Sequence, residues 1–429
     1  MIAKIVLDKK REGHALGTAE IREFIEGFTR GEIPDYQMSA LAMAICCRGM
    51  NERETADLTD AMTRSGTCLS WEGATADKHS TGGVGDKLSL VIQPLAAACG
   101  VSVPSLAGRG LGITGGTVDK LETIPGYSCA QPLGKFQEIV RDVGVSIAMQ
   151  TAEIAPADRK LYALRDVTGT VASIPLIVGS ILSKKLAEGA GTLVFDVKCG
   201  RGAFMKSREE AIELAQALIA GATANGRKAA ALVTDMSAPL GRAVGNANEV
   251  AEALEILEAR GSNLEALCVE FAALMVSLAL GKSLDDAREE CRRKLADGSA
   301  CAKFVEMVEA QGGSIDAFKN RMKESVFKFT ISSPKSGFIA DIDAEKVAEV
   351  ALRLGAGRQN PDDRIDHLAG VNLCVGVGDR VSVASPLATI VSSVSPDLLE
   401  QNADALLRAF VFSPEKPPAK ELVLWKSID

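Results

Sequence analysis

The amino-acid sequence predicts an α/β protein with two additions: a small all-α domain, and a C-terminal α+β part. Residues up to about 66 carry apolar side chains at helical spacing. From residue 76, short β-branched runs alternate with helical patterns, which is typical of a mostly parallel mixed sheet covered by helices. After about residue 335 the composition changes to short valine-rich stretches separated by turns.

The N-terminal region is predicted to form helices. Thr18 precedes an amphipathic run, and Pro34 stands at the start of a second helical segment. Asn51 and Glu54 have the spacing of a capping box, so we expect a third helix to begin there. No residue type in this segment points to chemistry, and we interpret it as packing surface.

The central region is predicted to contain buried strands connected by helices. Ser207 and Glu210 form a capping box before a helix that follows one of these strands. In such sheets ligands bind beyond the carboxyl ends of the strands. The predicted strands are 101–106, 144–148, 192–197 and 229–234.

Two glycine-rich turns, 81–86 and 108–116, follow in this region. Glycine permits positive φ and leaves backbone N–H groups uncovered, so each turn can hold an anion. Lys78 and Ser80 add a cation and a hydroxyl beside the first turn. A phosphate is therefore the predicted ligand, although the glycines also suit ordinary turns between strands and helices.

Known nucleotide motifs fit these turns poorly. The sequence contains no G-x-x-x-x-G-K-[ST], which excludes a Walker loop. Residues 110–115 match G-x-G-x-x-G, but no acidic residue clearly follows at the required distance. We interpret that match as accidental.

Composition limits the function classes. The 429 residues carry a net charge of −8, which argues against a nucleic acid as partner, because such binding needs many Lys and Arg contacts to phosphate. A small anionic substrate needs only one local basic pocket. Hydrophobic residues make up 47% of the chain and charged residues 24%, as in globular proteins.

The sequence shows neither a clear targeting segment nor a clear metal-binding motif. The N-terminus shows no apolar segment of the secretory kind, and the longest apolar run, 271–280, is too short to span a bilayer. The ten cysteines form no C-x-x-C pair, and the three histidines are too far apart for a local zinc site. We expect a cytoplasmic protein that binds no membrane.

A helical insertion at 156–188 interrupts the strands. Lys184 follows Ser180 by four residues, so one helix face presents both side chains. Arg165 equally suits a surface ion pair, and Lys184 with Lys185 a solvated corner. The residues alone leave the role of this segment open.

Longer motifs identify a family. The segment KHSTGGVGDK, followed by GRGLGITGGTVDKLETIPG, resembles the signature of the pyrimidine-nucleoside and thymidine phosphorylases. The similarity continues through YALRDVTGTVASIPLIVGSILSKKLAEG, DVKCGRGAFMK and TDMSAPLGRAVGNANEV, and so covers nearly the whole chain. It implies reversible phosphorolysis of uridine, thymidine or 2′-deoxyuridine to free base and pentose 1-phosphate. It also implies a homodimer and no cofactor for catalysis.

The resemblance implies a domain arrangement. Residues 1–65 and 157–188 would form a helical, pyrimidine-binding domain, and residues 66–156 and 189–335 an α/β, phosphate-binding domain. Residues 336–429 would form the C-terminal domain. There GDRVSVASPLATI resembles a hammerhead of the lipoyl and biotinyl kind, without a lysine at a carrier position.

Roles for individual residues follow from the same resemblance. His79 would lie near the base O2 and act as a proton donor or electrostatic stabiliser, with Arg165 and Lys184 completing the catalytic set. The implied phosphate-binding residues are Lys78, Ser80, Ser89 and Thr117. The implied substrate-binding residues are Tyr162, Arg165, Ser180, Lys184 and Ser105.

A structural potassium ion is also implied. Several of its ligands would be backbone oxygens, and Lys87 fits the set poorly if its side chain points inward. The positions concerned are Gly85, Lys87, Leu240, Ala243 and Glu252.

Three positions depart from the family pattern. Ala107 stands where a serine is usual, which removes one phosphate hydroxyl and on the order of 1 kcal/mol of binding. Ile113 replaces a histidine that helps to latch the closed domains. Ser105 stands where pyrimidine-general members carry Lys and thymidine-selective members carry Met, so base and sugar preference stay open.

Two other functions stay possible on the sequence. A pentosyl transfer like that of anthranilate phosphoribosyltransferase would also use glycine-rich phosphate loops, but acidic magnesium ligands do not accompany KHSTGGVGD. A nucleoside-binding protein that has lost catalysis through Ala107 and Ile113 is the other alternative.

Overall fold

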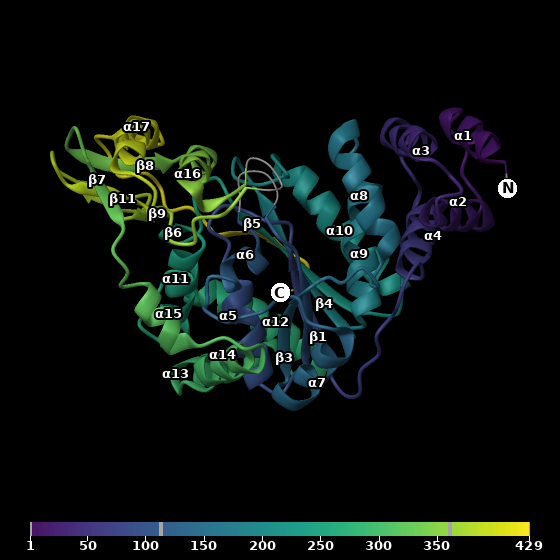
Figure 1. The fold of residues 1–429 in the computed structure, drawn as a ribbon, viewed down its shortest axis with the longest axis horizontal. Helices are drawn as coiled ribbons and strands as arrows, with labels where there is room; N and C mark the ends of the chain where they lie inside the picture. Colours follow the sequence, from purple (N-terminus) through teal and green to yellow (C-terminus); the bar gives the residue numbers. More distant parts are fainter. Residues whose placement is uncertain (1, 111–114, 359–362, 429) are drawn as a thin grey trace.

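The computed structural model describes residues 2–110, 115–358 and 363–428. Three parts follow one another along the long axis (Figure 1): a helical unit at the N-terminal end, a central α/β unit, and a C-terminal unit of short strands and helices. The predicted fold class is therefore confirmed.

The helical unit joins the N-terminal helices to the insertion. Phe24, Phe28 and Met38 share one buried core with Leu161 and Leu176, which come from more than a hundred residues later. The helices are α1 (Ala3–Arg11), α2 (Thr18–Arg30), α3 (Asp35–Arg48), α4 (Glu52–Thr63), α8 (Pro156–Thr168) and α9 (Ile174–Glu188).

The start of α4 is capped as predicted. Asn51 Oδ1 accepts the backbone N–H of Glu54 at 2.9 Å, and Glu54 Oε2 accepts that of Asn51 at 3.0 Å. Glu54 Oε1 also accepts a hydrogen bond from the buried Lys10 ammonium at 2.8 Å. This carboxylate thus joins α1 to α4.

The central sheet is parallel except at one edge. Strands β1, β4 and β5 run parallel, and β13 pairs antiparallel with β5. A parallel bridge between Thr75 and Ser102 connects β1 to the parallel pair β2–β3. The strands are β1 (Ala76–Ser80), β2 (Val103–Ala107), β3 (Val145–Met149), β4 (Thr192–Cys199), β5 (Lys228–Asp235) and β13 (Val423–Lys426).

The four predicted strands are all present, and β1 adds a fifth that the pattern did not reveal. Its five residues, ADKHS, are mostly polar, so hydrophobic periodicity gives no signal there. Lys78, His79 and Ser80 consequently lie on a strand that pairs with β4, and the first glycine-rich turn begins after it.

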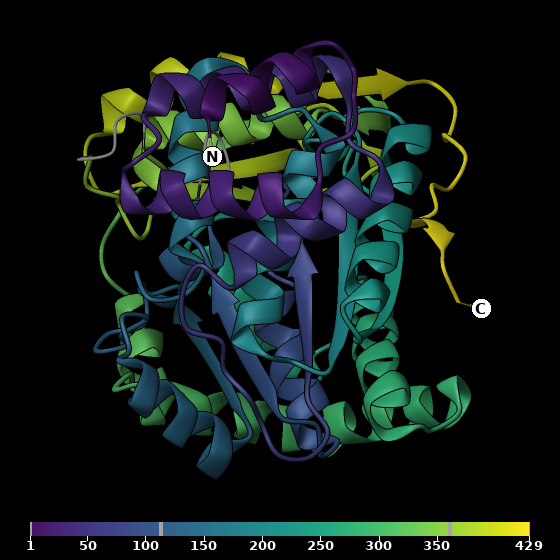
Figure 2. The same ribbon diagram turned by 90° about the vertical axis from the view of Figure 1, so that its right-hand side faces the viewer.

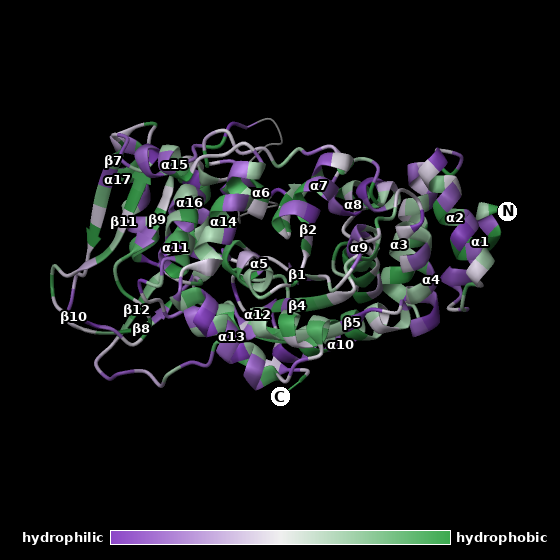
Figure 3. Cartoon of the chain, turned by 90° about the horizontal axis from the view of Figure 1, so that it is seen from below, coloured by the Kyte–Doolittle hydropathy of each residue, from purple (hydrophilic) through white to green (hydrophobic). Residues whose placement is uncertain are grey.

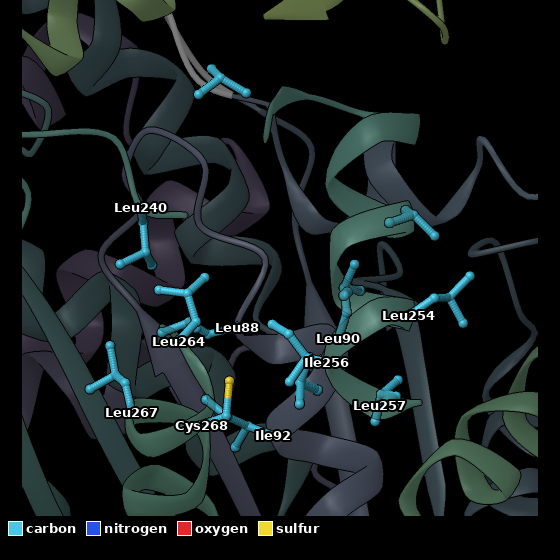
Figure 4. Close-up of a cluster of buried hydrophobic side chains, with 14 of the residues drawn as sticks. Leu88, Leu90, Ile92, Leu240, Leu254, Ile256, Leu257, Leu264, Leu267 and Cys268 are labelled. Carbon is cyan, nitrogen blue, oxygen red and sulfur yellow. The ribbon is translucent and has the colours of Figure 1, made fainter. Parts of the chain in front are cut away.

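Helices cover both faces of the sheet. Leu193 and Phe195 pack in the cluster of α9 and α10, whereas Val194 packs in the cluster of α5 and α12. Figure 4 shows part of the latter cluster, with Leu88 and Cys268 among its labelled residues. The helices around the sheet are α5 (Ser89–Ala98), α6 (Thr117–Leu121), α7 (Leu133–Val143), α10 (Arg208–Ala224), α11 (Ala247–Leu257), α12 (Glu265–Leu280), α13 (Leu284–Ala296), α14 (Ser299–Ala310) and α15 (Ile315–Arg321).

Hydropathy follows these layers. In Figure 3, β4, β5 and α12 are largely green, whereas α13 and the outer helices α1 and α2 show purple residues. The predicted apolar run at 271–280 lies in α12, whose side chains are mostly buried against the sheet and α5. Among the residues that the structure describes, no helix is long and apolar enough to cross a membrane.

The C-terminal unit contains two antiparallel sheets, ordered β10-β8-β12 and β6-β9-β11-β7. Its elements are β6 (Ala243–Gly245), β7 (Phe327–Ser332), β8 (Gly337–Ile342), α16 (Ala344–Ala351), the π-helix η1 (Leu352–Ala356), β9 (Gly370–Leu373), β10 (Arg380–Val381), β11 (Pro386–Ser392), α17 (Pro396–Leu407) and β12 (Phe410–Ser413).

Two strands cross between the units. β6 comes from the α/β part of the chain and adds to the C-terminal sheet. β13, at the end of the chain, returns to the central sheet, and Figure 2 shows this terminal segment coming down beside the α/β unit. Residues 423–426, expected in the C-terminal domain, therefore lie on the central sheet.

Candidate active site

A cavity of about 580 Å³ lies between the helical unit and the carboxyl ends of the central strands. We call it the interdomain cavity. Both basic clusters predicted from the sequence line it, so one ligand can contact both. The predicted catalytic, phosphate-binding and substrate-binding residues on its wall are Lys78, His79, Ser80, Ser89, Ser105, Thr117, Tyr162, Arg165, Ser180 and Lys184.

One end of the cavity, which we call the phosphate end because the predicted phosphate-binding residues lie there, is built from a strand end and a helix start. Ser80 ends β1, and Ser89 begins α5, which places the positive end of the α5 dipole at the cavity wall. Gly116 must lack a side chain, because a Cβ there would lie 2.2 Å from the backbone nitrogen of Gly110. Gly116 can therefore approach the backbone of residues 108–110 closely, just before Thr117.

Buried charges lie behind this end. Asp196 Oδ2 lies 3.0 Å from the Lys78 ammonium and 2.7 Å from that of Lys198. Asp86 Oδ2 is about 1 Å farther from each, at 4.0 and 3.9 Å. Within the described part of the chain, neither ammonium makes a well-directed hydrogen bond. Lys78, which lines the cavity, therefore keeps donors for an anion, and Lys198 adds a positive charge behind it.

Asp86 is an ionised carboxylate in this cluster. Burial alone would raise its pKa, but the Lys198, Lys78 and Lys120 ammonium groups hold that pKa well below its usual range. Ser80 Oγ donates a hydrogen bond to Asp86. Lys198 was not predicted as a site residue, although Asp196 and Lys198 are charged residues on one face of a mostly apolar strand.

His79 is neutral. Burial lowers the pKa of its imidazole well below the ordinary value, and the nearby Lys185, Lys184 and Lys78 charges lower it further. No hydrogen bond from the described residues fixes the ring, which lines the interdomain cavity. The neutral imidazole can offer one N–H to a ligand.

Arg165 lies at the opposite end, with 1% of its surface exposed. Its guanidinium donates to the carbonyls of Thr170 at 3.2 Å, Val171 at 2.8 Å and Leu176 at 2.9 Å. The guanidinium carbon lies 5.8 Å from the centre of the Tyr162 ring. Arg165 therefore organises the connection between α8 and α9 as well as lining the cavity.

Lys184 is the more accessible cation at this end, with 22% of its side chain exposed. Its ammonium lies 3.1 Å from Ser180 Oγ, one turn back on α9, as the spacing predicted. It also pairs with Asp158 of α8, which the sequence analysis missed because this residue lies 26 positions away. The pair holds the ammonium toward the cavity.

Lys185 is not at a solvated corner, which corrects that sequence-based alternative. Its buried ammonium contacts Asp77, the Leu106 carbonyl at 2.9 Å and Glu188 Oε2 at 3.0 Å. Glu188 also accepts the Leu106 N–H at 3.1 Å. Burial and Asp77 raise the pKa of Glu188. This network ties α9 to β1 and β2.

Three protein-family models match the chain. The helical bundle domain of a glycosyl transferase family matches residues 4–66, and the a/b domain of the same family matches residues 72–301. The C-terminal domain of pyrimidine nucleoside phosphorylases matches residues 338–411.

Individual relatives agree with these matches. A pyrimidine-nucleoside phosphorylase of Geobacillus stearothermophilus is 46% identical over 90% of this chain and 91% of its own. The chain belongs to the pyrimidine-nucleoside phosphorylase family. A Bacillus subtilis member is 45% identical over 90% of both chains, and a thymidine phosphorylase of Mesorhizobium japonicum is 42% identical over 99% of this chain and 98% of its own.

The fold also resembles a solved structure outside the family. Anthranilate phosphoribosyltransferase from Thermus thermophilus aligns with a TM-score of 0.58 and 21% identity, over 72% of this chain and 99% of that chain. At this identity the similarity concerns the fold alone.

One family-variable position has an unexpected neighbour. Ser105 on β2 receives a hydrogen bond of 2.7 Å from Gln93 Nε2, which also donates to Asp77 Oδ1 at 3.2 Å. Both Gln93 and Ser105 line the interdomain cavity. Gln93 was not predicted as a site residue, because a polar residue on a helix is usually exposed.

Ala107 and Ile113 are the other two positions that depart from the family pattern. Ala107 ends β2 at the cavity wall, so no hydroxyl is present at this point. Ile113 lies outside the described residues.

The five residues expected around potassium lie together. The Lys87 side chain is fully buried, and its ammonium contacts Leu240, Ala243 and Glu252. Gly85 lies against the same carbonyls of Leu240 and Ala243. A fixed positive charge therefore lies among the expected ligands.

Proposed function

We propose that this protein catalyses the reversible phosphorolysis of pyrimidine nucleosides. The observation that supports this most directly is the interdomain cavity, where an anion-binding loop faces a cationic clamp. Phosphate and base must be held on opposite sides of one pentose for this reaction, and the two ends of the cavity suit them. The relatives named pyrimidine-nucleoside and thymidine phosphorylase support the same reaction.

The phosphate end would hold the nucleophile. Backbone N–H groups, the hydroxyls of Ser80, Ser89 and Thr117, and the Lys78 ammonium fix phosphate by hydrogen bonds without bonding it covalently. A phosphate oxygen then forms a bond to C1′ of the pentose as the bond from C1′ to the base nitrogen breaks. The electron pair of the broken bond leaves with the base.

The opposite end would stabilise the departing base. Negative charge grows on the pyrimidine only as the C–N bond breaks, so a cation there lowers the barrier more than it strengthens substrate binding. Lys184 and Ser180 present donors at this end, and Arg165 adds a second positive charge. The neutral His79 N–H would hydrogen-bond a base carbonyl. These groups supply the whole reaction, so we propose no catalytic cofactor.

We infer a homodimer from the outer face of the helical unit. Ile5 on α1 and Tyr36 and Met43 on α3 are apolar side chains exposed by 58%, 73% and 43%. Large apolar side chains that are exposed to water favour association. Sedimentation equilibrium of the protein and of Tyr36→Glu tests this: we expect a dimer that the charge weakens.

The thiols favour a reducing compartment. All ten cysteines lie in the described part of the chain, and all are free. Cys99 Sγ and Cys291 Sγ are buried 3.8 Å apart, as hydrogen-bonded thiols and not as a disulfide. Thiols persist in the cytoplasm, whereas oxidising compartments form disulfides. We propose a cytoplasmic location, which fractionation of cells with an antibody against the protein would check.

A substrate panel tests the proposed reaction. Uridine, thymidine, 2′-deoxyuridine, cytidine and 2′-O-methyluridine are incubated with the protein, and released base is followed by its absorbance at alkaline pH. We expect base release that requires phosphate and that stops in Lys78→Met. Release without phosphate would indicate hydrolysis, and nucleoside binding without release would indicate a binding protein; either result overturns the proposal.

A further inference from the structure

Lys87 occupies a built oxygen cage. Its side chain is fully buried, and its ammonium lies 2.8 Å from the Leu240 carbonyl, 3.1 Å from the Ala243 carbonyl and 2.7 Å from Glu252 Oε2. An ammonium group has three protons, and here each has one acceptor. The positive charge of Lys87 and the negative charge of Glu252 balance.

Hydrogen bonds hold the acceptor groups of the cage in place. Glu252 Oε2 accepts the Ala243 N–H at 2.8 Å, and Glu252 Oε1 accepts the Arg242 N–H at 2.9 Å. The same carboxylate thus fixes both the backbone that supplies the carbonyls and the ammonium between them. These carbonyls lie in the segment 240–243, just before β6.

The ammonium connects this segment to the first glycine-rich turn, 81–86, which we call the phosphate loop. Gly85 has φ of +75°, and a Cβ there would lie 2.7 Å from the Leu240 carbonyl oxygen. The loop therefore approaches the segment as closely as a backbone can. The Leu240 N–H also donates to the Val84 carbonyl at 2.9 Å. Two residues after Lys87, Ser89 opens α5 at the cavity.

A second buried ammonium, that of Lys120, also joins the loop to a glutamate of α11, and it contacts the loop at Asp86, the residue before Lys87. Lys120 donates to the Asp86 carbonyl at 2.7 Å and lies 2.8 Å from Glu249 Oε2. Glu249 and Glu252 are neighbours on α11, one turn apart. The phosphate loop is therefore held to α11 through two buried charges of the chain itself.

The cage is a poor site for potassium. Two carbonyls and a carboxylate are oxygen ligands that suit a hard cation. However, the Lys87 ammonium already fills the space between them, and it would repel a second positive charge at contact distance. The residues expected to bind potassium thus do not fit that ion while Lys87 is present.

We propose that the Lys87 ammonium takes the place of a bound monovalent cation, so that this protein orders its phosphate loop without potassium. Lys87 is a positioning residue: it does not touch the cavity but fixes Asp86 and Ser89, which do. The expected effect of Lys87 on phosphate affinity rests on the proposed phosphorolysis. The expected independence of stability from potassium does not rest on it.

Two variants separate charge from volume. Lys87→Ser removes the ammonium and leaves an oxygen-lined space, which potassium can enter and neutralise. Lys87→Met keeps the stem and fills the space without charge, so Glu252 is left unpaired in any salt. The variants are compared with the unaltered protein in potassium chloride and in tetramethylammonium chloride of equal ionic strength.

Thermal unfolding is the first readout. We expect the unaltered protein to have the same Tm in the two salts. Lys87→Ser should unfold at a lower temperature in tetramethylammonium and recover several degrees in potassium, roughly the effect of a ligand well above its Kd. Lys87→Met should be low in both salts. A Tm of the unaltered protein that rises specifically with potassium overturns the proposal.

Steady-state kinetics give the second readout. In tetramethylammonium, Lys87→Ser should raise the KM for phosphate several-fold more than the KM for nucleoside, and potassium should restore it. Equal changes in both KM values in either salt would contradict a positioning role. If neither variant folds, atomic emission of the unaltered protein, equilibrated with potassium and then gel-filtered, decides: about one retained ion per chain refutes the proposal. A protein without phosphorolysis still gives the thermal and emission results.

Discussion

Gln93 Nε2 lies 2.7 Å from Ser105 Oγ, and this pair forms part of the wall of the interdomain cavity. Because Gln93 is the donor, the Ser105 hydroxyl keeps its own proton for a ligand. Gln93 Nε2 is held in turn by Asp77, so the orientation of the amide is fixed. The pentose of a nucleoside that joins the two ends of the cavity would pass this wall.

Ser105→Ala should change sugar preference. We expect kcat/KM for uridine to fall about fivefold, which corresponds to one neutral hydrogen bond of about 1 kcal/mol, while that for 2′-deoxyuridine stays constant. The control is Ser102→Ala, which removes a hydroxyl from the bridge beside β1. An equal loss for both nucleosides would place Ser105 away from the 2′ position.

Lys184→Met should weaken the contacts to the pyrimidine base more than the contacts to phosphate. Loss of one charged hydrogen bond costs about 2 kcal/mol, so kcat/KM for nucleoside should fall roughly thirtyfold with little change in the KM for phosphate. Asp158→Asn keeps the ammonium but loosens its position, and should have a smaller effect of the same kind. A larger effect on the KM for phosphate than on nucleoside would contradict the assignment.

His79→Ala should lower kcat about tenfold or more while leaving the fold intact, because it removes a donor aimed at charge that grows in the transition state. Since the pKa of His79 lies well below its ordinary value, protonation of this imidazole should not lower kcat between about pH 6 and pH 8, so the variant and the unaltered protein should have pH profiles of the same shape there. Circular dichroism checks the fold. Unchanged turnover in the variant would remove His79 from the mechanism.

Stability should fall in mild acid because of the same residue. Below about pH 6.5 the unfolded imidazole binds a proton and the folded one does not, so the free energy of unfolding decreases as pH falls. The loss for His79 is at most about 1.4 kcal/mol per pH unit. His367 has a lowered pKa too, chiefly through burial.

Urea unfolding at about pH 7.5 and about pH 5.5 measures this difference. His79→Gln should lose less free energy of unfolding than the unaltered protein over this interval, and His367→Gln should do so independently. An identical pH dependence of the unaltered protein and His79→Gln would show that the imidazole titrates normally in the folded state.

Local signals in the sequence were enough for much of the fold. The Asn51–Glu54 and Ser207–Glu210 capping boxes involve residues three apart, and both are present in the structure. The strands of mostly apolar residues were found because burial dictates their composition. β1 escaped this reasoning, since charged neighbours from other elements make a polar strand stable in the interior.

The chemistry-bearing residue types were also visible as patterns. Lys78 and His79 stand beside glycines, and Ser180 and Lys184 share one helix face, so the sequence by itself determined which groups are available. The two helical segments and the strands come together only in the folded chain. Long-range packing therefore decided that both sets face one cavity.

Only the tertiary structure decided how the charges pair. Asp158 with Lys184, Lys78 with Asp196, and Lys87 with Glu252 are separated by 26, 118 and 165 positions. A carboxylate and an ammonium attract one another strongly only when both are buried within a few ångströms. No spacing along the chain encodes that condition, because it depends on which strands and helices become neighbours.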